Sequence, residues 1–212
     1  MKKLILLALF VMTSTAFAQT KATLKLFTAI EKNNISWAQN AIKEGADVNG
    51  VDDLKVPTTS VLLRAVQFER LEIVKLLLDA HADVNIRRPI DMHTPLMIAA
   101  RNDFAPIAEL LINRGADVNL VTILNRTALH ISALANSLSV AQVLIKAKDI
   151  DVNVRPTLCA MAVASRQGHA GIVLLLKKQT GSKASSPVCL ERSIELAEYN
   201  KHEEVLAILQ RN

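Results

Sequence analysis

Apolar residues recur at helical spacing through Thr94–Asn119. The first run, 96–100, is followed by a polar break at Arg101–Asp103, and a second apolar run covers Ile107–Ile112. Gly115 comes directly after the second run, where a left-handed residue commonly ends a helix. The pattern predicts a helix, a tight turn, a second helix and a glycine stop. Such a helix pair has apolar surface on more sides than it can cover alone, so similar pairs are expected on its flanks.

A short motif ending in Asp-Val-Asn occurs four times along the chain. Its aspartates are spaced 36, 34 and 34 residues apart, at Asp47, Asp83, Asp117 and Asp151. Upstream, Thr94-Pro95-Leu96 has counterparts at Ser60-Val61-Leu62, at Thr127-Ala128-Leu129-His130 and, more loosely, at Cys159-Ala160-Met161. This period and this motif resemble the ankyrin repeat, which has a period of about 33 residues and the signature T-P-L-H-x-A. The resemblance covers nearly all of the chain after residue 18.

The resemblance implies an all-α fold, an ankyrin-repeat solenoid of about six helix-turn-helix repeats with short hairpin-like loops. One domain is expected over residues 19–212. It would comprise an N-terminal cap at 21–49, internal repeats at 57–85, 91–119, 125–153 and 156–185, and a C-terminal cap at 188–212. Within it, Trp37 is expected to pack inside the N-terminal cap, His81 to take the place of the capping glycine, and His130 to have a structural role.

The start of the chain has the pattern of an export signal. Lys2 and Lys3 precede an apolar run over residues 4–12, and Ala16-Phe17-Ala18 matches a small-residue cleavage site. The apolar run is shorter than the roughly 18 residues that a membrane span requires, and no later segment is long enough to span. Residues 1–18 are therefore predicted to be a cleaved bacterial signal peptide, which gives a periplasmic protein that begins at Gln19.

Charge and motifs exclude several classes of function. Without Lys2 and Lys3 the basic residues number 23 instead of 25, against 20 acidic residues, so the net charge is +3. This charge is too small to indicate nucleic-acid binding, and no basic cluster with interleaved aromatic residues is present. The sequence has no nucleophile elbow, phosphate-binding loop or zinc-protease motif, and its five histidines lack metal-ligand spacing. We expect no enzyme activity, no catalytic residues, no metal site and no cofactor.

The two cysteines, Cys159 and Cys189, are thirty residues apart at similar points of adjacent repeats. One interpretation is a periplasmic disulfide that fastens the last repeat. The other is a pair of small buried residues, because stacked repeats often hold matching atoms too far apart for a bridge.

Ankyrin arrays typically bind proteins through their loop tips and the concave face of their first helices. The loops before the third and fourth repeats are unusually apolar for such tips, and arginines stand among the apolar residues. A monomer rarely keeps an exposed apolar patch without a function, and apolar anchors beside arginine are typical of interface hot spots. The residues expected to bind a partner are Phe68, Arg87, Arg88, Ile90, Met92, Arg101, Leu120, Val121, Ile123, Leu124, Arg126, Leu134 and Arg166. The alternative is that the loop residues pack only against one another.

These features indicate a protein that acts by binding another periplasmic protein. The expected partner is an exported enzyme. The first hypothesis is a stoichiometric inhibitor or immunity protein for a cell-wall (peptidoglycan) peptidase. The alternative is a scaffold or chaperone-like helper of an exported enzyme such as a catalase. The free protein is expected to be a monomer, with no nucleic-acid partner and no membrane span after signal cleavage.

Overall fold

The computed structural model describes residues 20–52, 59–152, 158–178 and 187–211. The chain forms two compact units, Met1–Ile90 and Asp91–Asn212, and each is described by itself. The predicted signal peptide at 1–18 and the predicted starts of two repeats, at 57 and 156, lie outside the described residues. The predicted domain limits therefore stay predictions.

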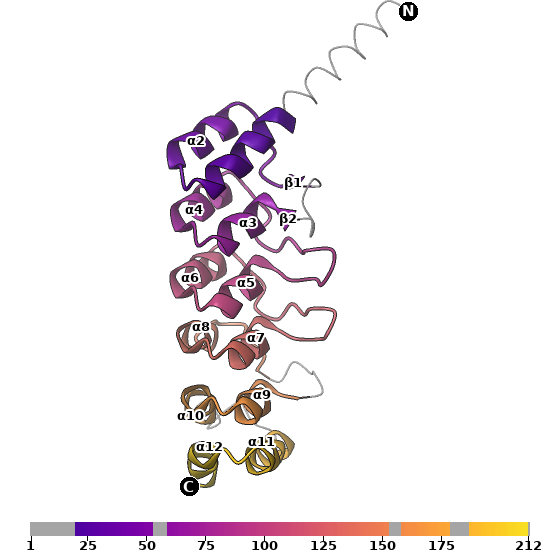
Figure 1. The fold of residues 1–212 in the computed structure, drawn as a ribbon, viewed down its shortest axis with the longest axis vertical. Helices are drawn as coiled ribbons and strands as arrows, with labels where there is room; N and C mark the ends of the chain where they lie inside the picture. The colour runs from indigo at the N-terminus through magenta and orange to yellow at the C-terminus, as the bar shows by residue number, and fades with distance from the viewer. Residues whose placement is uncertain (1–19, 53–58, 153–157, 179–186, 212) are drawn as a thin grey trace, which may run out of the picture. The chain divides into compact units, whose positions relative to one another are not determined.

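The first unit begins with a helical segment at residues 20–31, followed by α2 (Ile35–Lys43). Two short strands, β1 (Val51–Asp52) and β2 (Thr59–Ser60), pair antiparallel with Val51 opposite Ser60. They lead into α3 (Val61–Gln67) and α4 (Leu71–Asp79). Helix α4 packs against both α3 and α2, so that helix pairs stack as the repeat pattern predicts (Figure 1).

The described residues of the second unit form four helix pairs. Its first helices are α5 (Pro95–Asn102), α7 (Ala128–Ala135), α9 (Ala160–Gln167) and α11 (Pro187–Tyr199). Its second helices are α6 (Ala105–Asn113), α8 (Leu138–Leu144), α10 (Ala170–Lys178) and α12 (Glu203–Gln210). Each first helix packs on the next first helix and each second helix on the next second helix, which gives two parallel layers (Figure 1). The predicted all-α repeat solenoid is confirmed as the fold class.

The first helices begin where the repeated motif places a hydroxyl side chain. The side chains of Ser60, Thr94 and Thr127 accept hydrogen bonds from backbone N–H groups three residues later, at 3.3 to 3.5 Å. These bonds satisfy N–H groups that have no partner inside the helix. Cys159 occupies the same position before α9 and makes no such bond.

Left-handed residues separate the two helices of each pair. They are Asn33, Glu69, Asp103, Asn136, Gly168 and Lys201, with φ between 52° and 78°. The predicted tight turn is present at Asp103, while Arg101 and Asn102 of the polar break still belong to α5. The predicted stop at Gly115 is confirmed by its φ of 87°, and His81 adopts the same left-handed conformation at 65°.

Polar side chains connect successive repeats. The Asn49 side chain accepts from the backbone N–H of Asp83 at 2.7 Å, and Asn119 accepts from that of Asp151 at 2.8 Å. The Asp103 carboxylate accepts from the backbone N–H of Val140 and so caps α8 from the preceding repeat. The repeated Asp-Val-Asn motif therefore supplies hydrogen bonds between repeats.

His130 is buried at the start of α7, where its Nδ1 lies 2.7 Å from the Thr127 hydroxyl. Burial lowers the pKa of His130 from 6.5 to about 4. The nearby Leu158 backbone opposes this change, and the positive charge of Arg126 adds to it. The folded protein therefore holds this imidazole neutral, in a structural position.

Leu111→Ala tests the packing of the second helices. Leu111 is completely buried in α6, so the truncation should leave a cavity and lower the free energy of unfolding by about 2–5 kcal/mol. The adjacent Leu110 is only half-buried, and Leu110→Ala should cost clearly less. Denaturant unfolding of both variants provides the comparison. A loss below about 0.5 kcal/mol for Leu111→Ala would contradict the packing.

The lowered pKa of His130 predicts sensitivity to acid. The unfolded chain takes up a proton below pH 6.5, whereas the folded chain does so only near pH 4. The stability contribution is therefore complete above pH 6.5 and is lost as the pH falls toward 4, by about 3 kcal/mol in total. Unfolding curves of the wild type and of His130→Leu, measured from pH 7.5 to 4, should converge by this amount at acid pH. Parallel pH profiles would refute the assignment.

Candidate protein-binding surface

The loop before α7 ends in a tight turn that Thr122 closes. The backbone N–H of Asn125 donates to the Thr122 carbonyl at 2.9 Å, and the N–H of Thr122 donates to the Arg126 carbonyl at 3.0 Å. The Thr122 hydroxyl accepts from the N–H groups of Leu124 and Arg126, both at 3.2 Å. Asn125 completes the turn in the left-handed conformation, with φ of 55°. Backbone groups and one buried hydroxyl thus close this loop.

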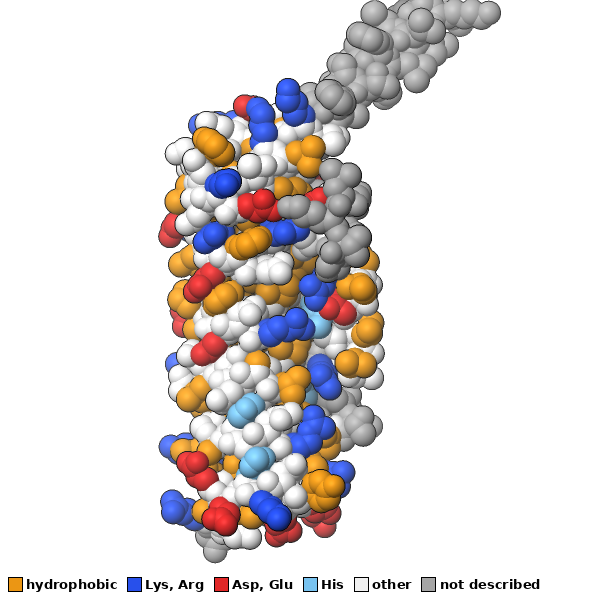
Figure 2. Space-filling view, viewed as in Figure 1, with side chains coloured by type: hydrophobic (Ala, Val, Ile, Leu, Met, Phe, Trp, Pro, Cys, Tyr) orange, Lys and Arg blue, Asp and Glu red, His pale blue; other side chains and the backbone are white. Residues whose placement is uncertain are grey.

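The two central residues of the turn are apolar and exposed. Ile123 is 64% exposed and Leu124 is 63% exposed, so neither side chain takes part in closing the turn. Their neighbours Leu120 and Val121 are half-buried. Hydrophobic side chains are visible on the loop side of the second unit, beside Lys and Arg side chains (Figure 2). The turn therefore presents a fixed apolar tip to the solvent.

The loop before α5 contains the boundary between the two units. In the first unit Ile90 is 65% exposed, whereas Arg87 and Arg88 are half-buried. In the second unit Met92 is half-buried and has φ of 61°. A long side chain rarely adopts this left-handed conformation, so Met92 holds the loop in a strained form.

The inner face of the second unit carries one predicted residue from each of three first helices. Arg101, Leu134 and Arg166 each occupy the second-to-last position of α5, α7 and α9. These helices pack in succession, so the three residues stand in a row. Arg101 is exposed and the other two are half-buried. These three predicted residues thus lie side by side on successive helices, as a basic, an apolar and a basic side chain.

Arg101 is held by a residue of the preceding loop. Its Nη2 lies 2.7 Å from Nε2 of His93, and Nδ1 of His93 lies 2.9 Å from Oδ2 of Asp91. His93 is only 8% exposed. Reasoning from the sequence missed this chain of contacts. In the sequence, the two residues are only eight positions apart. This spacing indicates a contact only when the loop is known to run beside the end of α5.

In the first unit, two guanidinium groups lie close to the ring of Phe68. The Arg64 and Arg70 groups are 5.8 and 5.7 Å from its ring centre, within the range of cation–π interactions. Arg70 also donates from Nε to the Ile30 carbonyl. Phe68 is 38% exposed, so an aromatic ring with two arginines beside it remains accessible. The sequence indicated Phe68 but gave no reason to connect it with these arginines.

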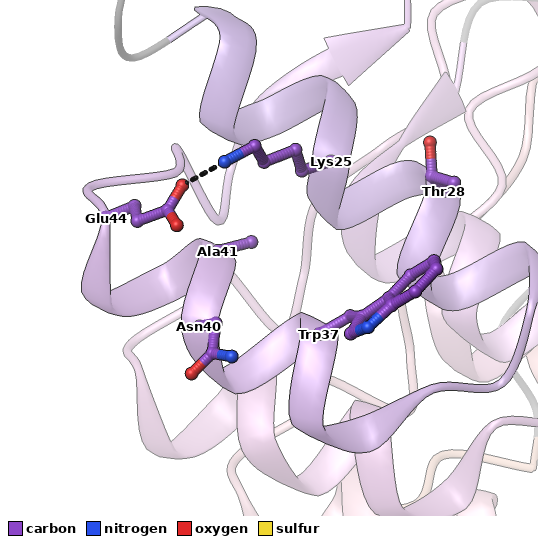
Figure 3. A pocket seen from close by; sticks show the side chains of 6 residues that line it. All are labelled: Lys25, Thr28, Trp37, Asn40, Ala41 and Glu44. Atoms are coloured by element: carbon purple, nitrogen blue, oxygen red, sulfur yellow. Dashed lines mark hydrogen bonds and ion pairs between the residues drawn. The ribbon is translucent and has the colours of Figure 1, made fainter.

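The prediction that Trp37 packs inside the N-terminal cap is wrong. Trp37 is 54% exposed, whereas the buried residues of α2 are Ala38 and Ala41. Its ring points toward the helical segment 20–31 (Figure 3). Across the same hollow, Lys25 and Glu44 form an ion pair at 2.6 Å. The hollow has a volume of about 340 Å³ and is lined by Lys25, Thr28, Trp37, Asn40, Ala41 and Glu44.

Cys159 and Cys189 form a disulfide that joins the start of α9 to the first turn of α11. Their Cα atoms are 6.1 Å apart, which is within the range that a disulfide spans. The sequence left open whether the two cysteines form a disulfide or are only buried, and in the structure they form the disulfide.

Among the residues that the structure describes, no group of three or more His, Cys, Asp or Glu residues could hold a metal ion. Across the same ranges, no helix is both long and apolar enough to cross a membrane. The features that remain are Phe68 and its arginines in the first unit and the apolar turn and inner row in the second, and each has the character of a protein-binding surface on stacked helix pairs.

Comparison with known families agrees with this class. The ankyrin repeat family, described as ankyrin repeats in three copies, matches residues 62–156 and 96–186, which together span more than half of the 212 residues. The chain belongs to the ankyrin repeat family. Members of this family are typically non-enzymatic modules for protein–protein interaction, and a protein partner is the expectation for this chain as well.

Curated relatives share only part of their length with this chain. An ankyrin repeat protein of Fowlpox virus is 29% identical over 131 residues, which are 61% of this chain and 38% of the viral protein. Alpha-latrocrustotoxin-Lt1a of Latrodectus tredecimguttatus is 36% identical over 101 residues, 47% of this chain and 7% of the toxin. Neurogenic locus notch homolog protein 1 of Xenopus tropicalis is 33% identical over 124 residues, 57% of this chain and 5% of that protein.

Proposed function

We propose that this chain is a periplasmic ankyrin-repeat protein that binds an exported enzyme one-to-one and inhibits it. The target class is a cell-wall (peptidoglycan) peptidase, for which the chain would act as an immunity protein. The proposal rests mainly on one observation, the exposed apolar turn at Ile123 and Leu124 that Thr122 closes from beneath.

The turn suits an inhibitor because it is already formed before any partner binds. Its hydrogen bonds come from the backbone and from Thr122, which is only 6% exposed. Burying two exposed side chains of this size stabilises a complex by about 1.5–3 kcal/mol each, and little entropy is lost when the loop is rigid beforehand. A protruding rigid tip can occupy a substrate cleft and exclude the substrate without any chemistry of its own.

The proposed compartment rests on two features. The sequence pattern of residues 1–18 is that of a cleaved export signal. The Cys159–Cys189 disulfide adds support, because disulfides persist in the oxidising bacterial periplasm and are rare in the cytosol. Peptidoglycan hydrolases of that compartment can damage the cell that makes them, which supplies a reason for a dedicated inhibitor.

Export can be tested on protein recovered from a bacterial periplasm. Sequencing should find Gln19 as the first residue, and thiol counting on the denatured, unreduced protein should find no free thiol. Reduction should then lower the free energy of unfolding by about 3–4 kcal/mol, because the bridge closes a loop of thirty residues. Retention of Lys2 and Lys3 in a membrane fraction, or two free thiols, would contradict the proposal.

Charge placed on the tips should weaken binding without unfolding the protein. Ile90→Asp combined with Ile123→Asp should weaken the partner complex by at least about 2 kcal/mol, or about 30-fold in Kd. Both side chains are more than 60% exposed, so the melting temperature should hardly change. The measurement is titration of the partner captured from a periplasmic extract by the wild-type protein.

Two controls define the result. Thr122→Ala removes the hydroxyl that holds the turn and should weaken binding while both apolar side chains remain. His130→Ala should lower stability, and the fraction that stays folded should bind normally. If the double Asp variant is folded and binds like the wild type, the tips are not the interface, and the leading candidates become Phe68 in the first unit and the row of Arg101, Leu134 and Arg166 in the second.

The activity of the captured enzyme separates inhibition from assistance. An inhibitor should abolish turnover as the molar ratio reaches about one to one. Turnover that stays constant or rises, above all for a captured catalase, would overturn the inhibitor proposal and favour the scaffold or chaperone-like helper.

A further inference from the structure

From the contacts of His93 we infer that Arg101 is a carboxylate-binding residue of the inner face, and that it recognises an acidic side chain of a protein partner. His93 and Asp91 act as positioning residues for its guanidinium. The inference rests on the proposed binding function and adds to it the chemistry of one contact.

The contacts define the proton positions on His93. A guanidinium can only donate hydrogen bonds, so Nε2 of His93, 2.7 Å from Nη2 of Arg101, must accept. With Nε2 accepting, the ring proton of the neutral imidazole is on Nδ1, which lies 2.9 Å from Oδ2 of Asp91, at ion-pair distance but without the geometry of a hydrogen bond. Oδ1 of Asp91 also accepts from the backbone N–H of His93 at 3.2 Å. His93 is therefore a neutral imidazole of fixed tautomer, buried between an acid and a base.

This arrangement fixes an otherwise mobile side chain. An arginine on a surface has many rotamers and loses entropy when it binds. The buried His93 ring anchors one N–H of Arg101 in advance and leaves four of its five donors. Within the part of the chain that the structure describes, His93 is the one hydrogen-bond or ion-pair partner of Arg101. An exposed, anchored guanidinium without a carboxylate partner is suited to receive one by a charge-assisted, bidentate contact.

The charge of the surrounding face favours an acidic ligand. Helices α5, α7 and α9 contain no Asp or Glu, and they contribute Arg101 and Arg166. The loop before α7 adds Arg126 and, over residues 119–127, no acidic residue. Asp91 and Asp103, which stand just before and just after α5 in the chain, are engaged already, Asp91 with His93, and Asp103 with Val140 and Ser139. An acidic segment that lies across α5, α7 and α9 would therefore meet positive charge and no carboxylate from these three helices.

The test uses the purified protein and an acidic decapeptide of Glu and Ser, with a Gln-for-Glu peptide of the same length as the control. In nuclear magnetic resonance spectra at low ionic strength, the Nε–Hε signal of Arg101 is identified by its loss in Arg101→Gln. The Glu peptide should shift this signal, and the Gln peptide should not. The Kd of the Glu peptide should rise at least fivefold in Arg101→Gln. Arg192→Gln makes the same charge change on α11, at a residue paired with Glu195, and should leave the Kd within twofold.

The positioning role has its own variants. The side-chain carbonyl of His93→Gln can still accept from Arg101, so this variant should keep the affinity for the Glu peptide within twofold. The leucine of His93→Leu cannot accept a hydrogen bond, so this variant should lose as much affinity as Arg101→Gln although Arg101 is still present.

An unmoved Arg101 signal, or equal losses in the Arg101 and Arg192 variants, would overturn the carboxylate site. Equal affinities in both His93 variants would overturn the positioning. None of these results depends on the tips, so failure here is distinct from failure of the inhibitor proposal.

Discussion

The close approach of successive first helices is the constraint on which the second unit depends. The fifth and sixth positions of α5, α7 and α9 hold only Ala or Ser, at 99–100, 132–133 and 164–165, and all six residues are fully buried. Small side chains there let neighbouring backbones pack tightly, as close packing of protein interiors requires. The scarcity of aromatic residues, 3% of the chain, follows from the same geometry.

Close stacking also determines how polar groups are satisfied. A helix end in one repeat lies beside the turn of the next, so side chains reach across: Asp103 caps α8, and His169 contacts the Ala133 carbonyl at 2.8 Å. His202 lies in the same relation to the Arg166 carbonyl, at 3.1 Å. Buried or half-buried backbone groups are costly when unpaired, so each repeat relies on its neighbour for part of its hydrogen bonding. Scattered histidines that look chemically suggestive in the sequence thus have structural partners.

The sequence was sufficient for the fold and only partly sufficient for the surface. Periodicity and the recurrent Thr and Asp-Val-Asn positions predicted the helix pairs, because these positions have local physical roles as caps and links between repeats. The apolar tip at Ile123 and Leu124 was also predictable, since apolar residues stand where a polar turn is usual. The exposure of Trp37 was not predictable, because it depends on how α2 packs in the folded N-terminal cap. The contact of Arg101 with His93 was not predictable either, since it depends on the path of the loop beside the helix end.

The way in which Thr122 closes its turn separates folding from recognition. The two positions at the apex carry no hydrogen bond of the loop except through their backbone, and their side chains contribute little to the core. Mutations there are therefore largely free of the stability threshold that limits change elsewhere in a protein. Such a site can exchange one specificity for another in single steps, each step leaving a folded protein. In a binding module whose target changes over time, this turn is a place where substitutions lower the stability of the fold very little.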